Sequence, residues 1–294
     1  MKNRLRIALQ KKGRMAQESL NLLKACGLKF RMKDNALLTH VDNFPIDLLF
    51  IRDDDIPTLV FDEICDGGIV GDNVLQEAAL KRPQANWQNL TSLGSCRCRL
   101  SIAVPEQFEW SGPGSLDGKR IATSYPELLQ SYLNRYQLQA DILNLSGSIE
   151  VAPRMGMADA ICDLVSSGQT LEDNQLKEVD VVMPSEAIFI RSAKLYSPDQ
   201  ENLFNLLVRR IEGVQKAQEC KYILFHAPKS ALASICACLP GVESPTVIPQ
   251  ADQPDKVVVH VVSSERIFWN TLEQIQELGA SSILVLPIEK MLTD

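Results

Sequence analysis

The sequence predicts an α/β protein with two α/β lobes and a small C-terminal domain. Short apolar runs alternate with amphipathic helical segments through most of the chain, which is the pattern of βα units. After residue 220 the expected order changes to βαββαβ, the ferredoxin-like split unit. A length of 294 residues suits two domains or three small ones.

The first lobe is predicted from its turn and cap residues as well as its apolar runs. Gly27 ends the first helix, Asp53 to Asp55 cap the second, and Pro57 suits its first turn. The expected strands are 5–9, 45–51 and 67–71, and the expected helices are 15–25, the one beginning near 55, and 73–79.

The second lobe follows the same alternation, with Ser124 expected to cap its first helix. Its expected strands are 95–104, 120–123, 140–145, 158–165 and 179–183, with a helix over 124–136. Strand 187–191 is expected to return to the first lobe before helix 198–216. The chain thus passes between the lobes twice, near residues 95 and 186, as in type II periplasmic binding proteins. We therefore assign 1–95 with 186–220 to lobe I and 96–185 to lobe II.

Residues 221–294 are assigned to a small domain of ferredoxin-like (ACT-like) fold, a kind that more often binds an effector or a neighbouring subunit than performs catalysis. Its expected strands are 222–225, 246–249, 256–262 and 283–286, and its expected helices are 229–238 and 264–278. The apolar face of the second helix is expected in the core and comprises Ile267, Phe268, Leu272, Ile275 and Leu278.

Bulk composition excludes several classes of function. Thirty Lys and Arg residues against 37 Asp and Glu residues give a net charge of −7 without a long basic run, so no nucleic-acid partner is expected. No apolar stretch approaches the roughly 20 residues of a membrane span, and the N-terminus lacks the apolar core of a signal peptide. The eight cysteines show no zinc-ligand spacing, so reduced thiols and a cytoplasmic location are expected.

Residues 150–171 carry the most informative motif, EVAPRMGMADAICDLVSSGQTL. An apolar strand containing Asp163 leads into a polar turn at the start of a helix, where hydroxyls and backbone N–H groups suit a phosphate. The turn comprises Ser166, Ser167, Gly168, Gln169 and Thr170. Glu150 and Asp163 repel anions, but they can accept hydrogen bonds from a ribose diol or hold Mg²⁺. From spacing alone, an ordinary strand, turn and capped helix with solvated acids is the more common explanation.

This motif resembles the signature of the ATP phosphoribosyltransferase family. The matching positions are Glu150, Gly156, Ala158, Ile161, Asp163, Leu164, Ser167, Gly168, Thr170 and Leu171. Similar segments occur at 5–14, 52–57, 118–126 and 282–290, so the chain resembles the long form that carries its own regulatory domain.

The resemblance implies a transferase that joins N1 of the adenine of ATP to C1 of phosphoribosyl pyrophosphate and expels pyrophosphate, with Mg²⁺ as cofactor. It places the 5-phosphate on residues 166–170 and the ribose or the metal at Asp163 and Glu150. It further implies feedback inhibition by histidine at the C-terminal domain, for which Thr246 and Ala280 are candidates, and assembly into dimers and hexamers.

Four further candidates lie at strand ends. Lys11 and Arg14 could contact the pyrophosphate or the ATP phosphates, although a solvated basic loop explains them equally well. Arg52 is a weaker candidate of the same kind, and Tyr125 could stack on a base or simply pack. The Asp53 to Asp55 run could bind a metal, but an acidic helix start is the more frequent explanation.

A function of a different class fits the same two-lobed outline. A non-catalytic cytoplasmic binding protein or sensor could close on a small ligand without chemistry, and a lack of turnover with ATP, phosphoribosyl pyrophosphate and Mg²⁺ would identify it.

Overall fold

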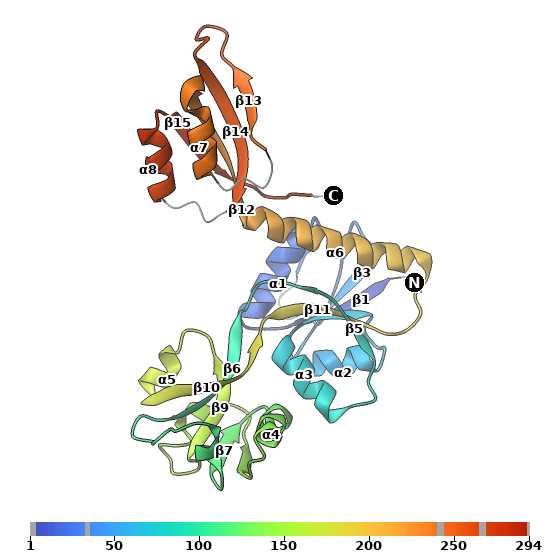
Figure 1. Ribbon diagram of the computed structural model, residues 1–294. Helices are drawn as coiled ribbons and strands as arrows, with labels where there is room; N and C mark the ends of the chain where they lie inside the picture. Colours follow the sequence, from blue (N-terminus) through green and yellow to red (C-terminus); the bar gives the residue numbers. More distant parts are fainter. Residues whose placement is uncertain (1–3, 33–35, 240–243, 265–268, 293–294) are drawn as a thin grey trace. The chain divides into compact units, whose positions relative to one another are not determined.

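The computed structural model describes residues 4–32, 36–239, 244–264 and 269–292. It divides into two compact units, Met1–Asn202 and Leu203–Asp294, and the division falls inside helix α6 (Pro198–Gln218). The predicted α/β class is confirmed, because the described residues form three separate sheets with helices packed against them (Figure 1). Within those residues, no helix combines the length and the apolar character needed to cross a membrane.

The first sheet of the N-terminal unit has the strand order β2-β3-β1-β4-β11-β5. Its strands are β1 (Leu5–Gln10), β2 (Leu38–His40), β3 (Ile46–Ile51), β4 (Gly67–Gly71), β5 (Trp87–Ser92) and β11 (Ala187–Ser192). β1 is parallel to β3 and β4, whereas β11 is antiparallel to β4 and β5. Helices α1 (Arg14–Ala25), α2 (Asp55–Phe61) and α3 (Asp72–Lys81) follow β1, β3 and β4. The carboxyl ends of these three strands therefore meet at one edge.

The second sheet of this unit repeats the arrangement with the order β10-β6-β9-β7-β8. Its strands are β6 (Cys98–Pro105), β7 (Arg120–Thr123), β8 (Asp141–Asn144), β9 (Ala160–Val165) and β10 (Leu176–Ser185). β7 is parallel to β8 and β9, whereas β6 is antiparallel to β9 and β10. Helices α4 (Pro126–Arg135) and α5 (Gln169–Asp173) follow β7 and β9, so this lobe also has one edge of parallel strand ends.

The chain crosses between these two lobes twice, as the sequence predicts. In each sheet one interior antiparallel strand arrives from the other lobe, β6 in the second sheet and β11 in the first. Hydrogen bonds hold the return crossing on α3. The Asn73 N–H donates to Ser185 Oγ at 3.0 Å, and this hydroxyl donates to Asn73 Oδ1 at 2.7 Å. Both side chains are buried, so this crossing has a fixed anchor in lobe I.

Strand β4 explains how α2 approaches the first sheet so closely. All five residues of β4 are buried, and two of the first three positions are occupied by glycine. A Cβ at Gly68 would lie 2.6 Å from Ile56 Cγ2, so any larger residue would push α2 away. Glycine at this position therefore allows α2 to pack directly on β4.

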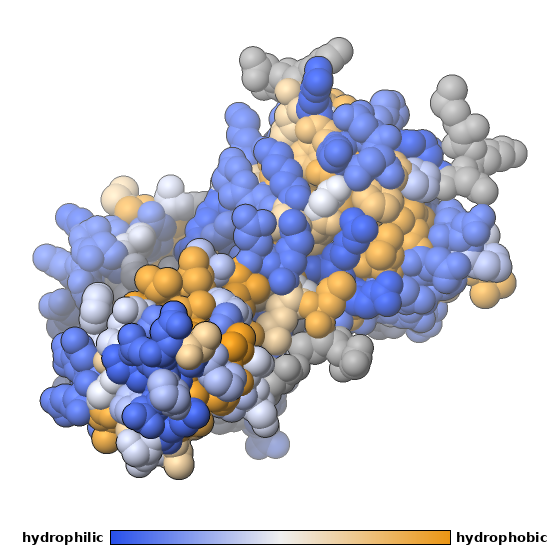
Figure 2. All heavy atoms as spheres, turned by 90° about the horizontal axis from the view of Figure 1, so that it is seen from above, coloured by the Kyte–Doolittle hydropathy of each residue, from blue (hydrophilic) through white to orange (hydrophobic). Residues whose placement is uncertain are grey.

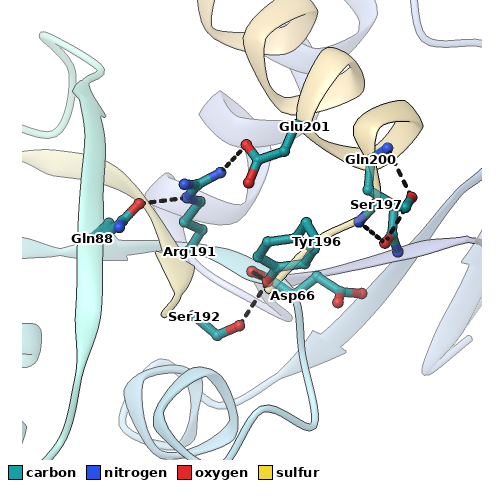
Figure 3. Close-up of polar contacts among 8 residues, drawn as sticks. All are labelled: Asp66, Gln88, Arg191, Ser192, Tyr196, Ser197, Gln200 and Glu201. Atoms are coloured by element: carbon teal, nitrogen blue, oxygen red, sulfur yellow. Dashed lines mark hydrogen bonds and ion pairs between the residues drawn. The ribbon is translucent and has the colours of Figure 1, made fainter. Parts of the chain in front are cut away.

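The link from β11 to α6 is held by a polar cluster around Tyr196 (Figure 3). The Tyr196 hydroxyl donates to the Asp66 carbonyl at 2.9 Å and lies 2.6 Å from Ser192 Oγ. Burial raises the pKa of Tyr196 to about 12, so this phenol remains a donor at neutral pH. Arg191 reaches Glu201 in the first turn of α6 at 2.6 Å. The first turn of α6 is thus held to the lobe by several hydrogen bonds.

The C-terminal unit confirms the βαββαβ order, with the sheet order β13-β14-β12-β15 and antiparallel pairs throughout. Its elements after α6 are β12 (Cys220–Pro228), α7 (Leu232–Cys238), β13 (Thr246–Pro249), β14 (Lys256–Ser264), α8 (Trp269–Glu277) and β15 (Ser281–Pro287). Alternate residues of β12 and β14, including Phe225 and Val259, form one apolar cluster with Ile235 of α7 and Ile275 of α8. Apolar surface remains visible on this unit in Figure 2, at the lower left, between polar side chains. Of the apolar face predicted for α8, Ile267 and Phe268 lie outside the described residues.

Two strands and two helix caps differ from the sequence predictions. Strands β2 and β5 were not expected. In β5 (WQNLTS) the polar Gln88 and Asn89 interrupt the apolar pattern. Asp54 occupies the N-cap of α2 without a side-chain capping bond. Ser124 does not cap α4, since its hydroxyl donates to the Leu145 carbonyl at 2.7 Å and Tyr125 takes the N-cap position.

Substituting Tyr196→Phe should lower the free energy of unfolding of the N-terminal unit by about 1–2 kcal/mol, because it leaves buried acceptors without their donor. Chemical denaturation of the full chain followed by far-UV circular dichroism measures the change. Tyr136→Phe is the matched control. Tyr136 is 45% exposed, so water can hydrogen-bond to any polar group that the lost hydroxyl contacted. Equal stabilities of the two variants would contradict this role of Tyr196.

Candidate active site

Two carboxylates lie close together at the carboxyl end of β9. Asp163 is half-buried in β9, and Glu150 belongs to the short 3-10 helix Ile149–Val151. Burial raises the pKa of Asp163, and the negative charge of Glu150 raises it further, while a hydrogen bond from the Leu164 N–H opposes both effects. An acid pair with this mutual repulsion favours a cation or a hydrogen-bond donor between its members.

The polar turn predicted to hold phosphate follows β9 directly. Its members are Ser166, Ser167, Gly168, Gln169 and Thr170, and all but the half-buried Gly168 are exposed. Gly168 has φ +89°, a conformation that favours glycine, and its carbonyl accepts the N–H groups of Leu171 and Glu172 at 3.0 and 3.1 Å. The helix that follows, α5, has only five residues, so its dipole is weaker than the sequence suggested. Hydroxyls and local N–H groups are the turn's main means of binding an anion.

Arg99 is a cation beside this turn that sequence reasoning missed. It lies in β6 opposite Val165, and its guanidinium donates to the Ser166 carbonyl at 3.3 Å. The same guanidinium forms an ion pair with Glu178 of β10. Only the strand register brings Arg99 to the turn, 67 residues further along the chain, so no local pattern could have identified it.

Tyr125, at the end of β7, joins the apolar cores of both lobes. Its ring packs against the core of lobe II and against the cluster of lobe I that contains Val74. Burial raises the pKa of Tyr125, and so do the nearby charges of Asp163, Asp53 and Asp54. Tyr125 therefore packs against the core, one of the two roles expected from the sequence, and it also lies close enough to Asp163 for that charge to raise its pKa.

Lys11 and Arg52 are neighbours at the carboxyl edge of the first sheet. Gln10 and Ile51 are register partners, and the Lys11 N–H donates to the Ile51 carbonyl at 2.8 Å. Both cationic residues are exposed, so two positive charges face solvent at this strand edge. That arrangement suits a phosphate group.

Arg14 is not on the loop where the sequence placed it. It is the first residue of α1, and its Nε lies 2.6 Å from Glu18 Oε1. The other Glu18 oxygen accepts the Cys96 thiol at 3.0 Å. Because the Arg14 side chain is 70% exposed, solvent weakens this ion pair and the guanidinium can exchange partners.

A cavity of about 700 Å³ is lined by residues of both lobes. Lobe I contributes Asp53, Asp54, Glu77 and Lys81 among others, and lobe II contributes Tyr125 and the segment 144–147. The cavity thus lies at the ends of β3 and β7, next to the groups that surround Tyr125.

The two histidine candidates lie at opposite edges of the C-terminal sheet. Thr246 begins the edge strand β13, whereas Ala280 immediately precedes the other edge strand, β15. Two strands lie between them, which is roughly 14 Å at 4.7–4.9 Å per strand. One chain therefore does not bring them together.

The double crossing and the polar groups at the carboxyl edges of both sheets define a class, the bilobal α/β proteins that bind a small ligand at their strand ends. Comparison with known proteins narrows this class. Residues 52–213 match the profile of ATP phosphoribosyltransferase, and residues 217–290 match that of the HisG C-terminal domain. The chain therefore belongs to the ATP phosphoribosyltransferase family, the transferases that join ATP to phosphoribosyl pyrophosphate in histidine biosynthesis.

A solved structure of an ATP phosphoribosyl transferase is similar to this chain, in agreement with the family match. A chain of the ATP phosphoribosyl transferase (HisG:HisZ) complex from Thermotoga maritima is 26% identical with a TM-score of 0.59, over 71% of this chain and 98% of that one. The BvgS VFT2 domain from Bordetella pertussis is 13% identical with a TM-score of 0.47, over 71% and 86%. Protein AF1704 from Archaeoglobus fulgidus is 15% identical with a TM-score of 0.45, over 69% and 74%. The last two TM-scores are too low to support an assignment to any family. The family match favours the transferase over a non-catalytic binding protein.

Substituting Asp163→Asn should raise the melting temperature of the ligand-free protein at pH 7. The raised pKa means that the ionised carboxylate is less stable in the folded protein than in the unfolded chain. Ionised Asp163 therefore destabilises the folded protein increasingly as the pH rises from the ordinary pKa of 3.8 through the raised pKa of the folded protein. The gain should shrink as pH falls towards 4. Differential scanning calorimetry at both pH values measures it, with the exposed Asp173→Asn as control. A destabilised variant at pH 7 would contradict the electrostatic account.

Proposed function

We propose that the transferase divides its two substrates between the strand edges of the two lobes. The 5-phosphate of phosphoribosyl pyrophosphate binds residues 166–170, and the ribose hydroxyls bind the Asp163 and Glu150 carboxylates. The observation that supports this most is the junction of β9 with its turn, where two mutually repelling acids stand beside exposed hydroxyls and Gly168. Arg99 holds the Ser166 carbonyl and so keeps the turn in place.

Cations of lobe I are proposed to hold the leaving pyrophosphate or the ATP phosphates. Lys11 and Arg52 supply adjacent positive charges at one strand edge. Arg14 joins them by exchanging its exposed ion pair with Glu18 for a phosphate. Tyr125 lies near the acidic pair and forms part of the wall of the cavity between the lobes, where an adenine could stack.

Mg²⁺ fits the acids that this chain offers. Glu150 and Asp163 are two carboxylates close enough to raise a pKa, and the described residues contain no group of three or more His, Cys, Asp or Glu that could hold a metal. Mg²⁺ in proteins is commonly held by one or two carboxylates together with substrate phosphates. When bound, it would neutralise charge on the pyrophosphate.

The chain's own residues then act by positioning and electrostatics. Transfer develops positive charge at C1 of the ribose, which the nearby carboxylates stabilise, while the lobe I cations stabilise the departing pyrophosphate. Holding the adenine nitrogen in line with C1 supplies much of the remaining rate enhancement. The attacking nitrogen carries a lone pair, so the transfer step needs no general base.

We further propose that residues 221–294 regulate residues 1–220, with lobe I at 1–95 and 186–220 and lobe II at 96–185. Histidine acts as the inhibitor, with Thr246 and Ala280 as candidate contacts, and their separation in one chain favours a site completed by a second copy. Assembly into dimers and hexamers and a cytoplasmic location complete the proposal.

Thr170→Ala should reduce the rate of pyrophosphate release from phosphoribosyl pyrophosphate in the presence of ATP and Mg²⁺ by about 100-fold or more, because a charge-assisted hydrogen bond to phosphate is lost. Asp163→Ala should have a similar effect. A coupled pyrophosphate assay measures both, and Glu172→Gln, an exposed acid on the same short helix, serves as control. Near wild-type rates in both variants would remove this site assignment.

Thr246→Val should weaken inhibition by histidine about tenfold without changing turnover in its absence, since the variant keeps the shape of the side chain and loses one hydrogen bond. Turnover measured against increasing histidine gives the shift. Thr271→Val on α8 is the control, and identical inhibition curves for all three proteins would exclude Thr246 as a contact.

A further inference from the structure

Glu77 makes a contact between the lobes and is not one of the groups proposed to bind a substrate. It lies on α3 of lobe I and is only 6% exposed. One carboxylate oxygen accepts the Glu127 N–H at 3.1 Å, and the other accepts the Leu128 N–H at 2.9 Å. Both N–H groups belong to the first turn of α4 in lobe II. The carboxylate of one lobe therefore caps a helix of the other.

The first turn of α4 depends on this external cap. The first helical N–H groups have no intrahelical acceptor, and the N-cap residue Tyr125 supplies no side-chain bond. Pro126 has no N–H, and the Leu129 N–H already reaches the Tyr125 carbonyl at 3.0 Å. Glu127 and Leu128 thus provide the two donors that remain, and Glu77 accepts both. The positive end of the helix dipole further favours a carboxylate here.

Lys81 balances the charge that is buried in this contact. Its Nζ lies 3.0 Å from Glu77 Oε1, one helical turn away on α3. Both residues line the cavity between the lobes, as does Tyr125, which directly precedes α4 and packs against the cores of both lobes. The contact is therefore built into the wall of that cavity.

We propose that Glu77 is a positioning residue that latches α4 of lobe II to α3 of lobe I and thereby sets the spacing of the two half-sites. This inference rests on the proposed division of the substrates between the lobes. The backbone crosses between the lobes at β6 and at β10–β11, and Asn73 of α3 anchors the return crossing. The Glu77 latch adds a second tie from the same helix, one turn further along, to α4. A wider spacing would separate the nucleophile from C1, and a small misplacement is enough to slow such a reaction strongly.

The test compares wild type, Glu77→Gln and Asp72→Asn in the full chain. Asp72 is the matched control, since it is an acid on the same helix whose carboxylate accepts the Gln76 side chain at 3.0 Å. Amide hydrogen exchange is followed at Glu127 and Leu128 without substrates, and kcat and KM are measured for ATP and phosphoribosyl pyrophosphate. In wild type both amides should be protected. Glu77→Gln should increase their exchange about tenfold or more and lower kcat/KM by about tenfold, whereas Asp72→Asn should change neither.

The outcomes test the Glu77 latch independently of the proposed transferase function. Unprotected Glu127 and Leu128 amides in wild type would overturn the latch even if Glu77→Gln did not fold. Loss of protection in Glu77→Gln with unchanged kcat and KM would show a purely structural cap and overturn the positioning role. Absence of turnover in wild type would instead count against the proposed function, while the exchange result would still judge the contact.

Discussion

Two passages of the backbone between the lobes constrain the rest of the N-terminal unit. Because β6 enters the second sheet from lobe I and β11 enters the first sheet from lobe II, each lies antiparallel beside the parallel strands of its sheet. The parallel strands β1, β3 and β4 of one lobe, and β7, β8 and β9 of the other, can then present their carboxyl ends at one edge of each sheet. Every candidate group of the site, from Lys11 after β1 to the turn after β9, takes its place from this arrangement.

Charge is distributed unequally over those strand ends. Lobe II places Asp163 where burial and the nearby charge of Glu150 raise its pKa, whereas lobe I places Lys11 and Arg52 side by side in solvent. A ligand-free acid pair of this kind costs stability, and a bound diol or cation relieves that cost. The separation suits a substrate whose sugar and leaving group need opposite electrostatic surroundings.

Local sequence patterns predicted the elements whose residues are mostly buried. Strand β4 and the apolar part of β9 are buried runs bounded by turn residues, and both were expected nearly where they lie. Strand β5 was missed because Gln88 and Asn89 interrupt its apolar character, and its partner β11 is nearly a hundred residues away. Asp54 and Ser124 resemble helix caps, but tertiary contacts gave them other surroundings.

The sequence by itself determined the α/β class, the βαββαβ domain, and the acids and hydroxyls of the candidate site, because turn chemistry, hydrophobic period and a fixed motif are local properties. The tertiary structure alone decided which of those groups are neighbours. Arg99 reaches the Ser166 carbonyl through strand register, and Glu77 reaches α4 through the packing of two lobes. Arg14 is held by Glu18 instead of lying free on a loop. Contacts of this kind depend on sheet order and on the crossing of the chain, which no window of neighbouring residues contains.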